Sequence, residues 1–366
     1  MPFLTQISTQ AAQYQHSQAE VVALFKGIMS LDEDRRARLL FHFIQKNSPV
    51  VTRSSCLPMS LFRGPADDPD NLSQAPIGLL STGERQQLYE ENAPWLQEQL
   101  VKQHGQVKQP INNLITVSCT GYSTPGLDFN LRRYLPSKPD PFRYNVGAMG
   151  CYAGIVGLRL AAQLPGESWL NCLELCSLHF QREPNTFSIL ASNSLFADGA
   201  ALVTVSAEPA TIPGTAGLCF ELIDFGTAQI PDSLDEMSWY IRDRGYQMYL
   251  SESVPRLIGE QLASLCNPWL AQHQLTPTEI DHWAIHPGSK TILEAVTHSL
   301  ALDPEPTLKH SLAVLSRHGN MSSPTVFFIL KELIEHEALQ PGQKVVLLAF
   351  GPGLTAEAAL LKVVAA

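Results

Sequence analysis

Charged residues are scarce in this chain, and several features that mark other protein classes are missing. Asp, Glu, Lys and Arg together make up only 16% of the 366 residues. The seven cysteines stand apart without a Cys-x-x-Cys pair, so we expect free thiols in a reducing compartment rather than disulfides or a zinc ribbon. No apolar run reaches the ~18 residues that a membrane helix needs, and no signal-peptide pattern opens the chain. We therefore expect a soluble cytoplasmic protein with no membrane span.

The composition also restricts the partners. The net charge of −10 leaves no basic excess for binding nucleic acid, although an anionic cofactor could still bind a local basic cluster. Hydrophobic residues reach 45%, which together with the low charge indicates an extensive interior or subunit interface. We expect an oligomer, and the length favours two or three domains.

Hydrophobic periodicity predicts the types of element. Residues 1 to about 45 show helical spacing, and residues 62–83 are rich in Pro, Asp, Asn and Ser and are predicted to form a loop. A further helix follows, whose apolar face carries Leu88, Trp95, Leu96 and Leu100. Strands and helices then alternate to the C-terminus, which is the pattern of an α/β fold.

The alternating part of the chain repeats itself at long range. The repeated segments are strands 114–118 with 283–286, strands 172–180 with 345–350, and helices that begin at Cys151 and at Ser322. The offset between paired segments is nearly constant and is far too long for a solenoid repeat. We expect two similar halves, 1–213 and 214–366, with a site in the cleft between them. Chance similarity among α/β segments is the alternative.

Cys151 stands where a reactive thiol is expected. It lies in the run GAMGCYAG (147–154), in which small residues leave room for a substrate carbonyl and an apolar helical pattern begins. Unpaired N–H groups and the positive end of the helix dipole stabilise a thiolate at such a place. The alternative is a buried cysteine that packs as a small hydrophobe.

Two downstream motifs supply partners for this thiol. The apolar strand in WAIHPG (283–288) ends in His286 at a turn, and the polar glycine turn RHGNMSS (317–323) carries Asn320. A Cys followed at long range by a His and an Asn is the set needed for covalent acyl chemistry. The thiolate attacks, the imidazole pairs with it, and the amide donates a hydrogen bond.

Five motifs resemble those of the type III polyketide synthases, the group of thiolase-like condensing enzymes that includes chalcone synthase. They are MGCYAG (149–154), LFADGAA (195–201), IHPG (285–288), GNMSS (319–323) and FGPGLTAE (350–357), and they follow the family's order and spacing. The resemblance covers the chain from about residue 110 to the end. The segment before that point matches only loosely, and residues 62–77 have no counterpart.

The resemblance implies a fold, an activity and an assembly. The fold is a thiolase-like α/β fold in which two similar halves form a layered αβαβα core. The activity is that of an acyltransferase whose substrates are an acyl-CoA starter and malonyl-CoA, with no permanently bound cofactor. The assembly is a homodimer.

The resemblance also assigns roles to three residues. Cys151 corresponds to the nucleophile that takes an acyl group from a coenzyme A thioester and holds the growing chain. His286 and Asn320 correspond to the pair that polarises the thioester carbonyl of malonyl-CoA and stabilises the enolate left by carbon dioxide. Two neutral donors in a dry pocket are suited to such an oxyanion. The expected product is a small pyrone or a resorcinol- or phenol-type ring.

Further positions correspond to the family's substrate pocket. Phe196 corresponds to the gatekeeper phenylalanine between the coenzyme A tunnel and the cavity, with an ordinary core aromatic as the alternative. Trp239 replaces a small glycine of chalcone synthase, so we expect the pocket to disfavour a bulky aromatic starter and to accept an aliphatic acyl-CoA or malonyl-CoA itself. Thr124 replaces a methionine that crosses the dimer interface. The remaining pocket positions are Cys119, Cys176 and His179 in place of threonines, Met248 in place of a second gatekeeper, Ser322 near the catalytic residues, and the wall loop Gly351, Pro352 and Gly353.

Two other groups of residues carry atoms suited to binding phosphate groups or a metal ion. The basic residues Arg35, Arg36, Arg38 and Lys46, on or after an amphipathic helix, could meet the coenzyme A phosphates, although a solvated helix face explains each of them better. The pair Cys176 and His179 could suggest a metal, but a third ligand is missing, so we expect no metal site.

Three rival functions share some of these features. A papain-like cysteine protease also runs Cys, His, Asn, and His286 follows Cys151 at a spacing expected there, but the family's Cys-Gly-Ser/Ala-Cys-Trp/Tyr signature is absent. A single-condensation ketoacyl synthase acting on acyl-CoA or an acyl carrier protein shares the three residues and the fold, but lacks the LFADG and FGPGL motifs in this form. A non-catalytic partner subunit would not need the intact triad.

Overall fold

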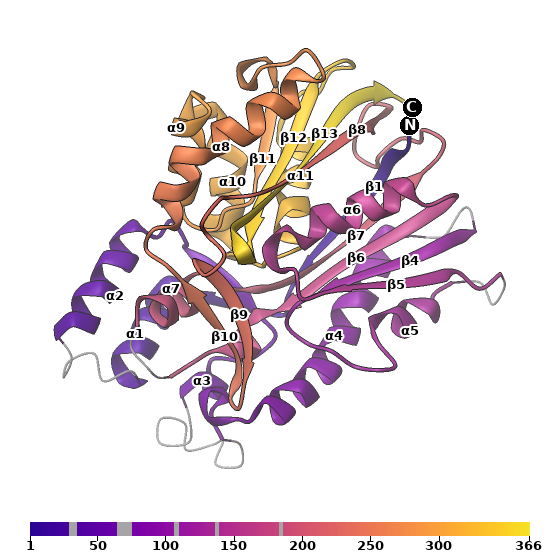
Figure 1. The fold of residues 1–366 in the computed structure, drawn as a ribbon. Coiled ribbons are helices and arrows are strands. Elements are labelled where there is room, and N and C mark those ends of the chain that lie inside the picture. The colour runs from indigo at the N-terminus through magenta and orange to yellow at the C-terminus, as the bar shows by residue number, and fades with distance from the viewer. Residues whose placement is uncertain (29–34, 64–74, 106–109, 136–138, 183–185) are drawn as a thin grey trace.

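The computed structural model describes residues 1–28, 35–63, 75–105, 110–135, 139–182 and 186–366 (Figure 1). The strands are β1 (Phe3–Ala11), β2 (Tyr14–Ser17), β3 (Thr52–Ser55), β4 (Ile111–Ser118), β5 (Phe142–Gly147), β6 (Glu167–Leu175), β7 (Asp198–Ser206), β8 (Leu218–Gln229), β9 (Met237–Arg242), β10 (Gly245–Leu250), β11 (His282–Ile285), β12 (Lys344–Gly351) and β13 (Thr355–Ala365). The α-helices are α1 (Gln18–Ile28), α2 (Arg35–Asn47), α3 (Ser60–Arg63), α4 (Thr82–His104), α5 (Leu127–Arg132), α6 (Ala153–Gln163), α7 (Phe187–Leu195), α8 (Val254–Ala271), α9 (Lys290–Ser299), α10 (Pro304–His318) and α11 (Thr325–His336). Short 3₁₀ turns are η1 (Ile77–Leu79), η2 (Gly150–Tyr152), η3 (Cys176–His179), η4 (Pro277–Glu279) and η5 (Pro352–Leu354).

A mixed sheet of nine strands runs through the molecule in the order β11-β12-β13-β8-β1-β7-β6-β4-β5. Its centre is a short antiparallel contact between β1 and β8, made by the pairs Phe3↔Glu221 and Leu4↔Phe220. Outward from this contact, each side adds two antiparallel pairs and then a parallel one, through β7, β6 and β4 on one side and β13, β12 and β11 on the other. Two similar halves would produce this order; their boundary at residues 213 and 214 stays a prediction.

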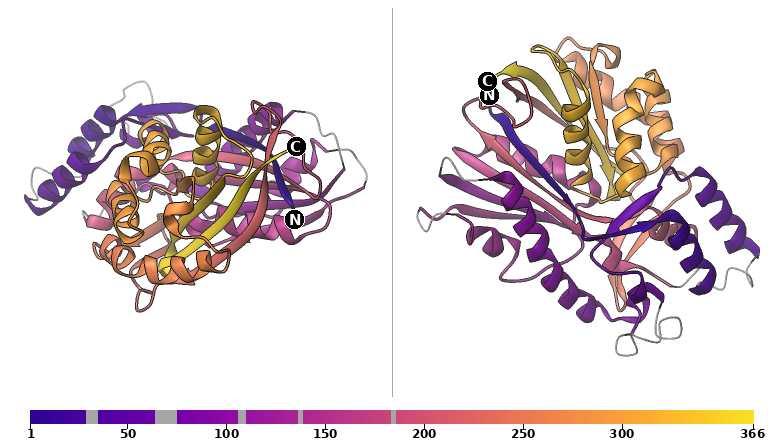
Figure 2. Two further views of the ribbon diagram at one scale, coloured as in Figure 1. Left: turned by 90° about the horizontal axis from the view of Figure 1, so that it is seen from above. Right: turned by 180° about the vertical axis from the view of Figure 1, so that it is seen from behind.

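The helices form three layers around the two parts of this sheet (Figures 1 and 2). The middle layer is α6 and α11, which contact strands of both parts, α6 against β4 and β13 and α11 against β1 and β11. On one outer face α4 packs against β1, β6 and β7, and on the other α8 and α9 share a core with β11, β12 and β13. This is the αβαβα layering of the thiolase-like fold, and it confirms the predicted α/β class.

Strands in this fold are apolar on both faces because helices cover both. In β12, Val345, Leu347 and Ala349 face the central core beside α6 and α11, whereas Val346, Leu348 and Phe350 face the outer core beside α8 and α9. Each such buried aliphatic or aromatic side chain stabilises the fold by about 1.5–3 kcal/mol relative to exposure. The continuous apolar runs of the sequence are therefore sheet strands between two helix layers.

The predicted elements are mostly confirmed, with three corrections. The segment 1–17 forms β1 and β2 rather than helix, because β1 pairs between β7 and β8 and long-range pairing overrides weak local propensity. The predicted strand 172–180 ends at Leu175 and continues as η3. The predicted loop 62–83 contains the end of α3, η1 and the start of α4, while its residues 64–74 lie outside the described part.

Within the described part of the chain, no helix has both the length and the apolar character that crossing a membrane requires.

Candidate active site

Cys151 lies on a turn that only small residues can make. The chain reaches η2 through Gly150, whose φ of 77° belongs to the left-handed region, and a Cβ there would lie 2.4 Å from the Pro352 ring. A Cβ on Gly351 would lie 2.6 Å from the Tyr152 ring and 3.3 Å from the Cys151 backbone nitrogen. The segment predicted as a cavity wall therefore packs against the back of the cysteine turn, and two glycines allow that close approach.

His286 follows β11 directly and is nearly inaccessible, with 1% of its surface exposed. Its backbone N–H donates to the Leu348 carbonyl at 2.7 Å, which extends the β11–β12 pairing to the histidine. Neither ring nitrogen has a hydrogen-bond partner among the described residues. Burial lowers the pKa of this imidazole to about 3, so the ring is neutral and both nitrogens are available to a substrate or to the thiol.

Asn320 is held by the segment that carries Phe196. The Asn320 N–H donates to the Leu195 carbonyl and the Asn320 carbonyl accepts from the Ala197 N–H, each at 2.8 Å. Its side-chain Oδ1 accepts from the Ser322 N–H at 2.8 Å. Because Oδ1 is occupied, the amide presents its Nδ2 donor to the cysteine side.

A buried arginine binds the end of helix α7, directly before Phe196. Arg53 on β3 donates to the Asn193 carbonyl at 2.6 Å and to the Ser194 carbonyl, which belong to the last turn of α7. A cation at this end of a helix is favoured by the dipole and satisfies carbonyls that lack partners. The arrangement links β3 through α7 to Phe196 and Asn320.

The structure brings the three predicted catalytic side chains to one cavity. Cys151, His286 and Asn320 line a space that we call the cysteine cavity, whose volume is about 450 Å³ when space open to solvent is included. Its other lining residues are Ser192, Leu195, Phe196, Met237, Met248, Leu250, Gly288, Ile292 and Phe350. Cys151 and Phe196 come from the N-terminal part of the sequence, whereas His286 and Asn320 come from the C-terminal part.

The protonation of Cys151 differs from the expectation of a stabilised thiolate. Burial raises the pKa of its thiol to about 12, although hydrogen bonds with the Ser322 and Asn320 side chains oppose this shift. The cysteine lies in η2, before the first residue of α6, and only 7% of its surface is exposed. Enclosure therefore outweighs the helix terminus, and the resting pair is a neutral thiol and a neutral imidazole.

Glu174 is a functional candidate that the sequence-based prediction missed. Its fully buried carboxylate, at the end of β6, accepts from the Cys119 N–H at 2.9 Å, the Thr120 hydroxyl at 2.8 Å and the Ser323 hydroxyl at 2.6 Å. Burial raises the pKa of this group to about 7. It joins the end of β4 to the turn before α11, next to Cys151. An acidic residue inside the apolar strand WLNCLELC (169–176) was the signal available in the sequence.

A second cavity, which we call the Trp239 cavity, adjoins the first. Its volume, including space open to solvent, is about 640 Å³, and its lining includes five predicted pocket residues, Cys176, His179, Phe196, Trp239 and Met248. The two cavities share Ser192, Phe196 and Met248. Phe196 thus stands between them, a position compatible with the gatekeeper role predicted for it.

Other predicted pocket residues lie outside both cavities. The Cys119 sulfur accepts from the Gly150 N–H at 3.0 Å, and the Cys119 carbonyl accepts from the Trp239 indole at 2.9 Å. This residue therefore stabilises the turn that carries Cys151. Ser322 has a φ of 60° and bonds to the Cys151 thiol. Thr124 precedes the cis residue Pro125 and is exposed on the surface of this single chain.

A third cavity, the α2–α9 cavity, adjoins the cysteine cavity. Its volume, including space open to solvent, is about 970 Å³, and it shares Leu195, Leu250 and Ile292 with the cysteine cavity. Its lining also includes Phe43 of α2 and Lys290, the first residue of α9, which the sequence-based prediction had not selected. The basic residues predicted for coenzyme A, Arg35, Arg38 and Lys46, are exposed on α2 and line none of these three cavities, and the Arg36 side chain lies outside the described residues.

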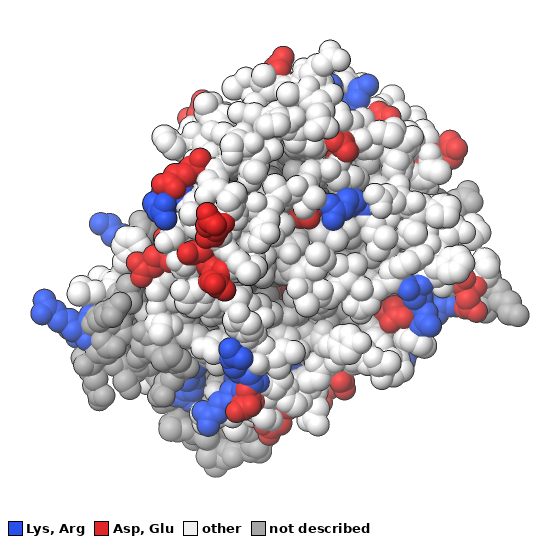
Figure 3. Space-filling model, in the orientation of Figure 1, with Lys and Arg blue, Asp and Glu red and all other residues white. Residues whose placement is uncertain are grey.

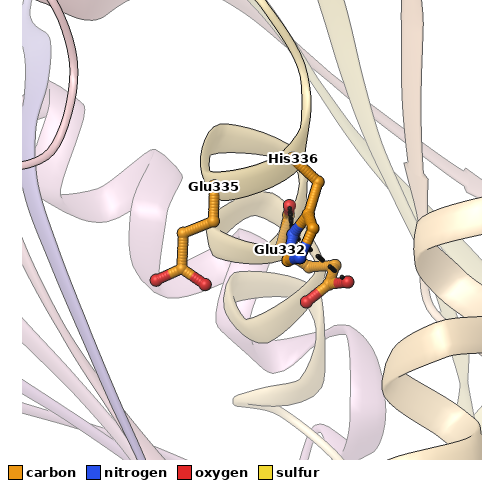
Figure 4. Close-up of side chains that lie close together, drawn as sticks. All are labelled: Glu332, Glu335 and His336. Carbon is orange, nitrogen blue, oxygen red and sulfur yellow. Dashed lines mark hydrogen bonds and ion pairs between the residues drawn. The ribbon is translucent and has the colours of Figure 1, made fainter.

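Two groups of residues in the described part of the chain carry potential metal ligands. Both ring nitrogens of His179 are occupied, one by the Thr120 carbonyl at 2.7 Å and the other by the Tyr246 N–H at 3.0 Å. The cluster Glu332, Glu335 and His336 on α11 brings three potential ligands together in the described part of the chain (Figure 4). Glu332 already pairs with Arg317 and with His336, and exposed acidic groups of this kind occur without a metal.

Comparison with known proteins gives consistent matches. The family model of the N-terminal domain of chalcone and stilbene synthases matches residues 47–209, and that of the C-terminal domain matches residues 223–365. A 3,5-dihydroxyphenylacetyl-CoA synthase of Streptomyces toyocaensis is 30% identical over 369 residues, which cover 99% of this chain and 90% of that protein.

Solved structures match over the whole chain. The polyketide synthase PKS-I of the brown alga Ectocarpus siliculosus has a TM-score of 0.84 at 26% identity, with 99% of this chain and 98% of that chain covered. The 1,3,6,8-tetrahydroxynaphthalene synthase of Streptomyces coelicolor A3(2), a bacterial type III polyketide synthase, has a TM-score of 0.84 at 22% identity with both chains fully covered.

Proposed function

Since this chain belongs to the family of chalcone and stilbene synthases and is a decarboxylative condensing acyltransferase, we propose that it acts as a type III polyketide synthase with Cys151 as its nucleophile. It loads the acyl group of an acyl-CoA starter, extends it with malonyl-CoA, and releases a small cyclised product. One observation supports this most strongly. Cys151, His286 and Asn320 line one buried cavity, and the imidazole there has no partner within the described protein.

Loading begins from the neutral pair. His286 takes the proton of the Cys151 thiol, and the thiolate attacks the carbonyl carbon of the acyl-CoA thioester. The C–S bond to coenzyme A breaks, and the departing thiolate takes the proton back from the imidazolium. Burial keeps the imidazole unprotonated at neutral pH, but it also makes this ring a weaker base. The proton transfer therefore depends on attraction between the thiolate and the imidazolium that form together as the thioester carbonyl is attacked.

Extension uses the two neutral donors. The thioester carbonyl oxygen of malonyl-CoA accepts hydrogen bonds from His286 and from Asn320 Nδ2. The bond to the carboxylate breaks, carbon dioxide leaves, and the electron pair forms an enolate whose oxygen these donors stabilise. The enolate carbon then attacks the acyl thioester on Cys151 and displaces the sulfur. Oxyanion donors in a water-poor site accelerate such steps because they are oriented before the charge develops.

The ring type is inferred from a relative. The Streptomyces toyocaensis protein is named for a dihydroxyphenyl product, which supports a phenol- or resorcinol-type ring here, with a pyrone as the simpler outcome. The substrates are coenzyme A thioesters, and the proposed site needs no permanently bound cofactor. The α2–α9 cavity is the proposed route by which the thioester reaches Cys151, with Lys290 beside it.

Family membership excludes the papain-like protease interpretation, because the matched family consists of condensing acyltransferases. The ketoacyl synthase alternative differs in its number of condensations and in its use of a carrier protein. Mass spectrometry of the products therefore separates it from a polyketide synthase, since a single condensation yields only a 3-ketoacyl product.

Replacing Cys151 by Ala tests the proposed nucleophile. Wild-type protein incubated with radiolabelled acyl-CoA should retain label after denaturation, whereas Cys151→Ala should retain none and should form no polyketide. Cys172→Ala is the matched control, because Cys172 is a fully buried core cysteine that lines none of the three cavities. Label at the wild-type level in Cys151→Ala would remove this residue from the mechanism.

A further inference from the structure

The Trp239 cavity continues away from Cys151 into the N-terminal part of the molecule. At the end nearest the cysteine cavity, the Trp239 ring lies 6.4 Å from the Phe196 ring and 5.6 Å from the His179 ring, measured between centroids. At the other end the lining includes Met59 and Phe62, beside helix α1 and strand β2. An acyl group on Cys151 that passed Phe196 would therefore enter a space lined by α1, α3 and α7 (Figure 1).

Apolar side chains line the far part of this cavity. They are Val21 and Leu24 of α1, Met59, Phe62 of α3, Phe180, and Ile189 of α7. Phe62 packs edge-on against Phe180 at 5.4 Å and against His16 at 5.9 Å, so aromatic rings close this end. Such a wall offers dispersion contacts and removal of apolar surface from water, which favour a hydrocarbon ligand.

Polar side chains on the same wall are engaged by the protein. The His16 imidazole bonds to the Leu57 carbonyl at 2.9 Å, and both nitrogens of His179 are occupied as described above. The Ser55 hydroxyl bonds to that of Ser177 at 3.1 Å. Asn193 donates to the Gln181 carbonyl at 2.6 Å and accepts from its N–H at 3.2 Å. A ligand in this cavity would have to break these bonds in order to satisfy polar groups of its own.

Some polar atoms of the lining residues have no such partner in the described part of the chain, and the Arg53 Nε is a fully buried one. Arg53 keeps its Nε without a partner among the described atoms, while its other nitrogens bind the α7 carbonyls and Gln18. A carboxylate at the end of an acyl chain is the ligand that would use this N–H, so it must be compared directly with an alkyl chain.

We propose that the Trp239 cavity binds the tail of an unbranched aliphatic starter, which names the substrate class of the function proposed above and rests on it. The thioester end of the starter lies at Cys151, the chain passes Phe196, and its methyl end lies against Met59 and Phe62. A hydroxylated aromatic starter fits poorly, because its phenol would be buried beside polar groups that are already paired, and unpaired buried polar groups are costly.

A chain-length series tests this proposal. Loading of wild-type enzyme is measured with acyl-CoAs from acetyl to dodecanoyl, and the value of kcat/KM should rise about fourfold for each methylene until the tail reaches the far wall. Hexanoyl-CoA should be preferred over adipyl-CoA, which has the same chain length with a terminal carboxylate, and over 4-coumaroyl-CoA. No dependence on chain length, or a preference for either competitor, would overturn the proposal; a preference for adipyl-CoA would assign Arg53 to carboxylate binding instead.

A substitution at the far end locates the tail. Met59→Trp should move the preferred length to shorter chains, and Met59→Ala should move it to longer ones. Leu61→Trp is the control, because Leu61 is half-buried in the same segment but does not line the cavity, and its profile should match that of the wild type. Unchanged profiles in both folded Met59 variants would refute the proposed position of the tail.

The proposed function and the proposed position of the tail fail in different ways. If no acyl-CoA of any length labels Cys151 and malonyl-CoA is not decarboxylated, the proposed function is wrong. If Cys151 is labelled and malonyl-CoA is decarboxylated, but the chain-length profile does not respond to Met59, only the inference about the tail is wrong.

Discussion

Burial and hydrogen bonding act in opposite directions on the Cys151 thiol. Enclosure raises its pKa, and the Ser322 and Asn320 side chains lower it without restoring the ordinary value. Without a base, almost no thiolate would exist at neutral pH. In the proposed mechanism the neutral His286 in the same cavity is that base, so we expect the cysteine and histidine to act together in the loading step.

Replacing Asn320 should distinguish acyl loading of Cys151 from decarboxylation of malonyl-CoA. In Asn320→Ala, malonyl-CoA decarboxylation should fall by ~10²-fold or more, because one donor to the enolate oxygen is lost. Acyl loading of Cys151 should fall much less, since His286 still removes the thiol proton. Decarboxylation is followed by release of labelled carbon dioxide, and loading by acyl label on the protein.

Asn92→Ala is the control for this comparison, because Asn92 lies on α4 and bonds only to the Leu88 carbonyl in the described contacts. Equal losses of loading and decarboxylation in Asn320→Ala would contradict the division of roles between the histidine and the asparagine.

The β9–β10 hairpin is the element that shapes the pocket. Trp239 on β9 pairs with Met248 on β10, and both line the Trp239 cavity. The Trp239 indole donates to the Cys119 carbonyl, which fixes the hairpin against the end of β4. His179 is stacked on Tyr246 of β10 with ring centroids 4.2 Å apart, so η3 is attached to the same hairpin.

Trp239→Gly should enlarge the pocket and change the product. Loss of the indole removes the wall next to Phe196, so larger starters should be accepted or the ring should close differently. Products from malonyl-CoA with a panel of acyl-CoAs are compared by mass spectrometry. Tyr240→Ala, at the exposed neighbouring position, should leave the products unchanged. If Trp239→Gly gives the wild-type spectrum, the indole does not limit the pocket.

At the scale of the whole molecule, one edge of the large sheet carries exposed apolar side chains. Phe142 on the edge strand β5 is 72% exposed, and Tyr122 in the loop before Thr124 is 69% exposed. In Figure 3 charged side chains are sparse over the middle of the face, whereas acidic and basic side chains gather at its right edge, on the side of β4 and β5. An exposed strand edge with apolar residues is a surface that proteins usually cover.

We therefore predict a homodimer, with an interface of the large obligate kind, above about 2,000 Å². Light scattering at micromolar concentration should give twice the mass of the 40.2 kDa chain. Phe142→Asp should weaken the dimer, whereas Tyr249→Asp, on the β9–β10 hairpin, should not. A monomeric wild type at that concentration would contradict the prediction.

Four histidines, three of them buried and His318 half-buried, should make the fold sensitive to acid. Burial lowers the pKa of His104, His179 and His286 to about 3 and that of His318 to about 4. Below pH ~6.5 the unfolded chain binds a proton at each of these positions and the folded chain does not, so the free energy of unfolding falls as the pH falls. Glu174, whose pKa is raised to about 7, binds a proton in the fold and offsets one of the four.

Together these four histidines and Glu174 should contribute a loss of about 4 kcal/mol per pH unit near pH 5 to the slope that urea unfolding measures at a series of pH values. His104 lies far from the cysteine cavity, where it bonds to the Ser8 and Thr204 hydroxyls. His104→Gln should therefore reduce the slope by about 1.4 kcal/mol per pH unit. An unchanged slope in this variant would mean that the histidine is not the source.

The family and the α/β class could be predicted from local motifs, because each motif joins residues of fixed chemical type to a turn that only those residues can make. Gly150, Cys151 and Gly351 illustrate this, since a Cβ at either glycine would collide with the other segment. The helices α4 and α6 and the strands β11 and β12 were predicted because their apolar periodicity is local.

Other features were decided only when distant segments met. Residues 3–11 form a strand because β7 and β8 lie on either side, and the thiol of Cys151 stays protonated because parts of both halves enclose it. Glu174 gained its partners from β4 and from the turn before α11. The division of the pocket by Phe196 likewise depends on residues that lie far apart in the chain. The local sequence determines which residues form each turn. Burial, protonation and cavity shape depend instead on many long-range contacts, which no single segment contains.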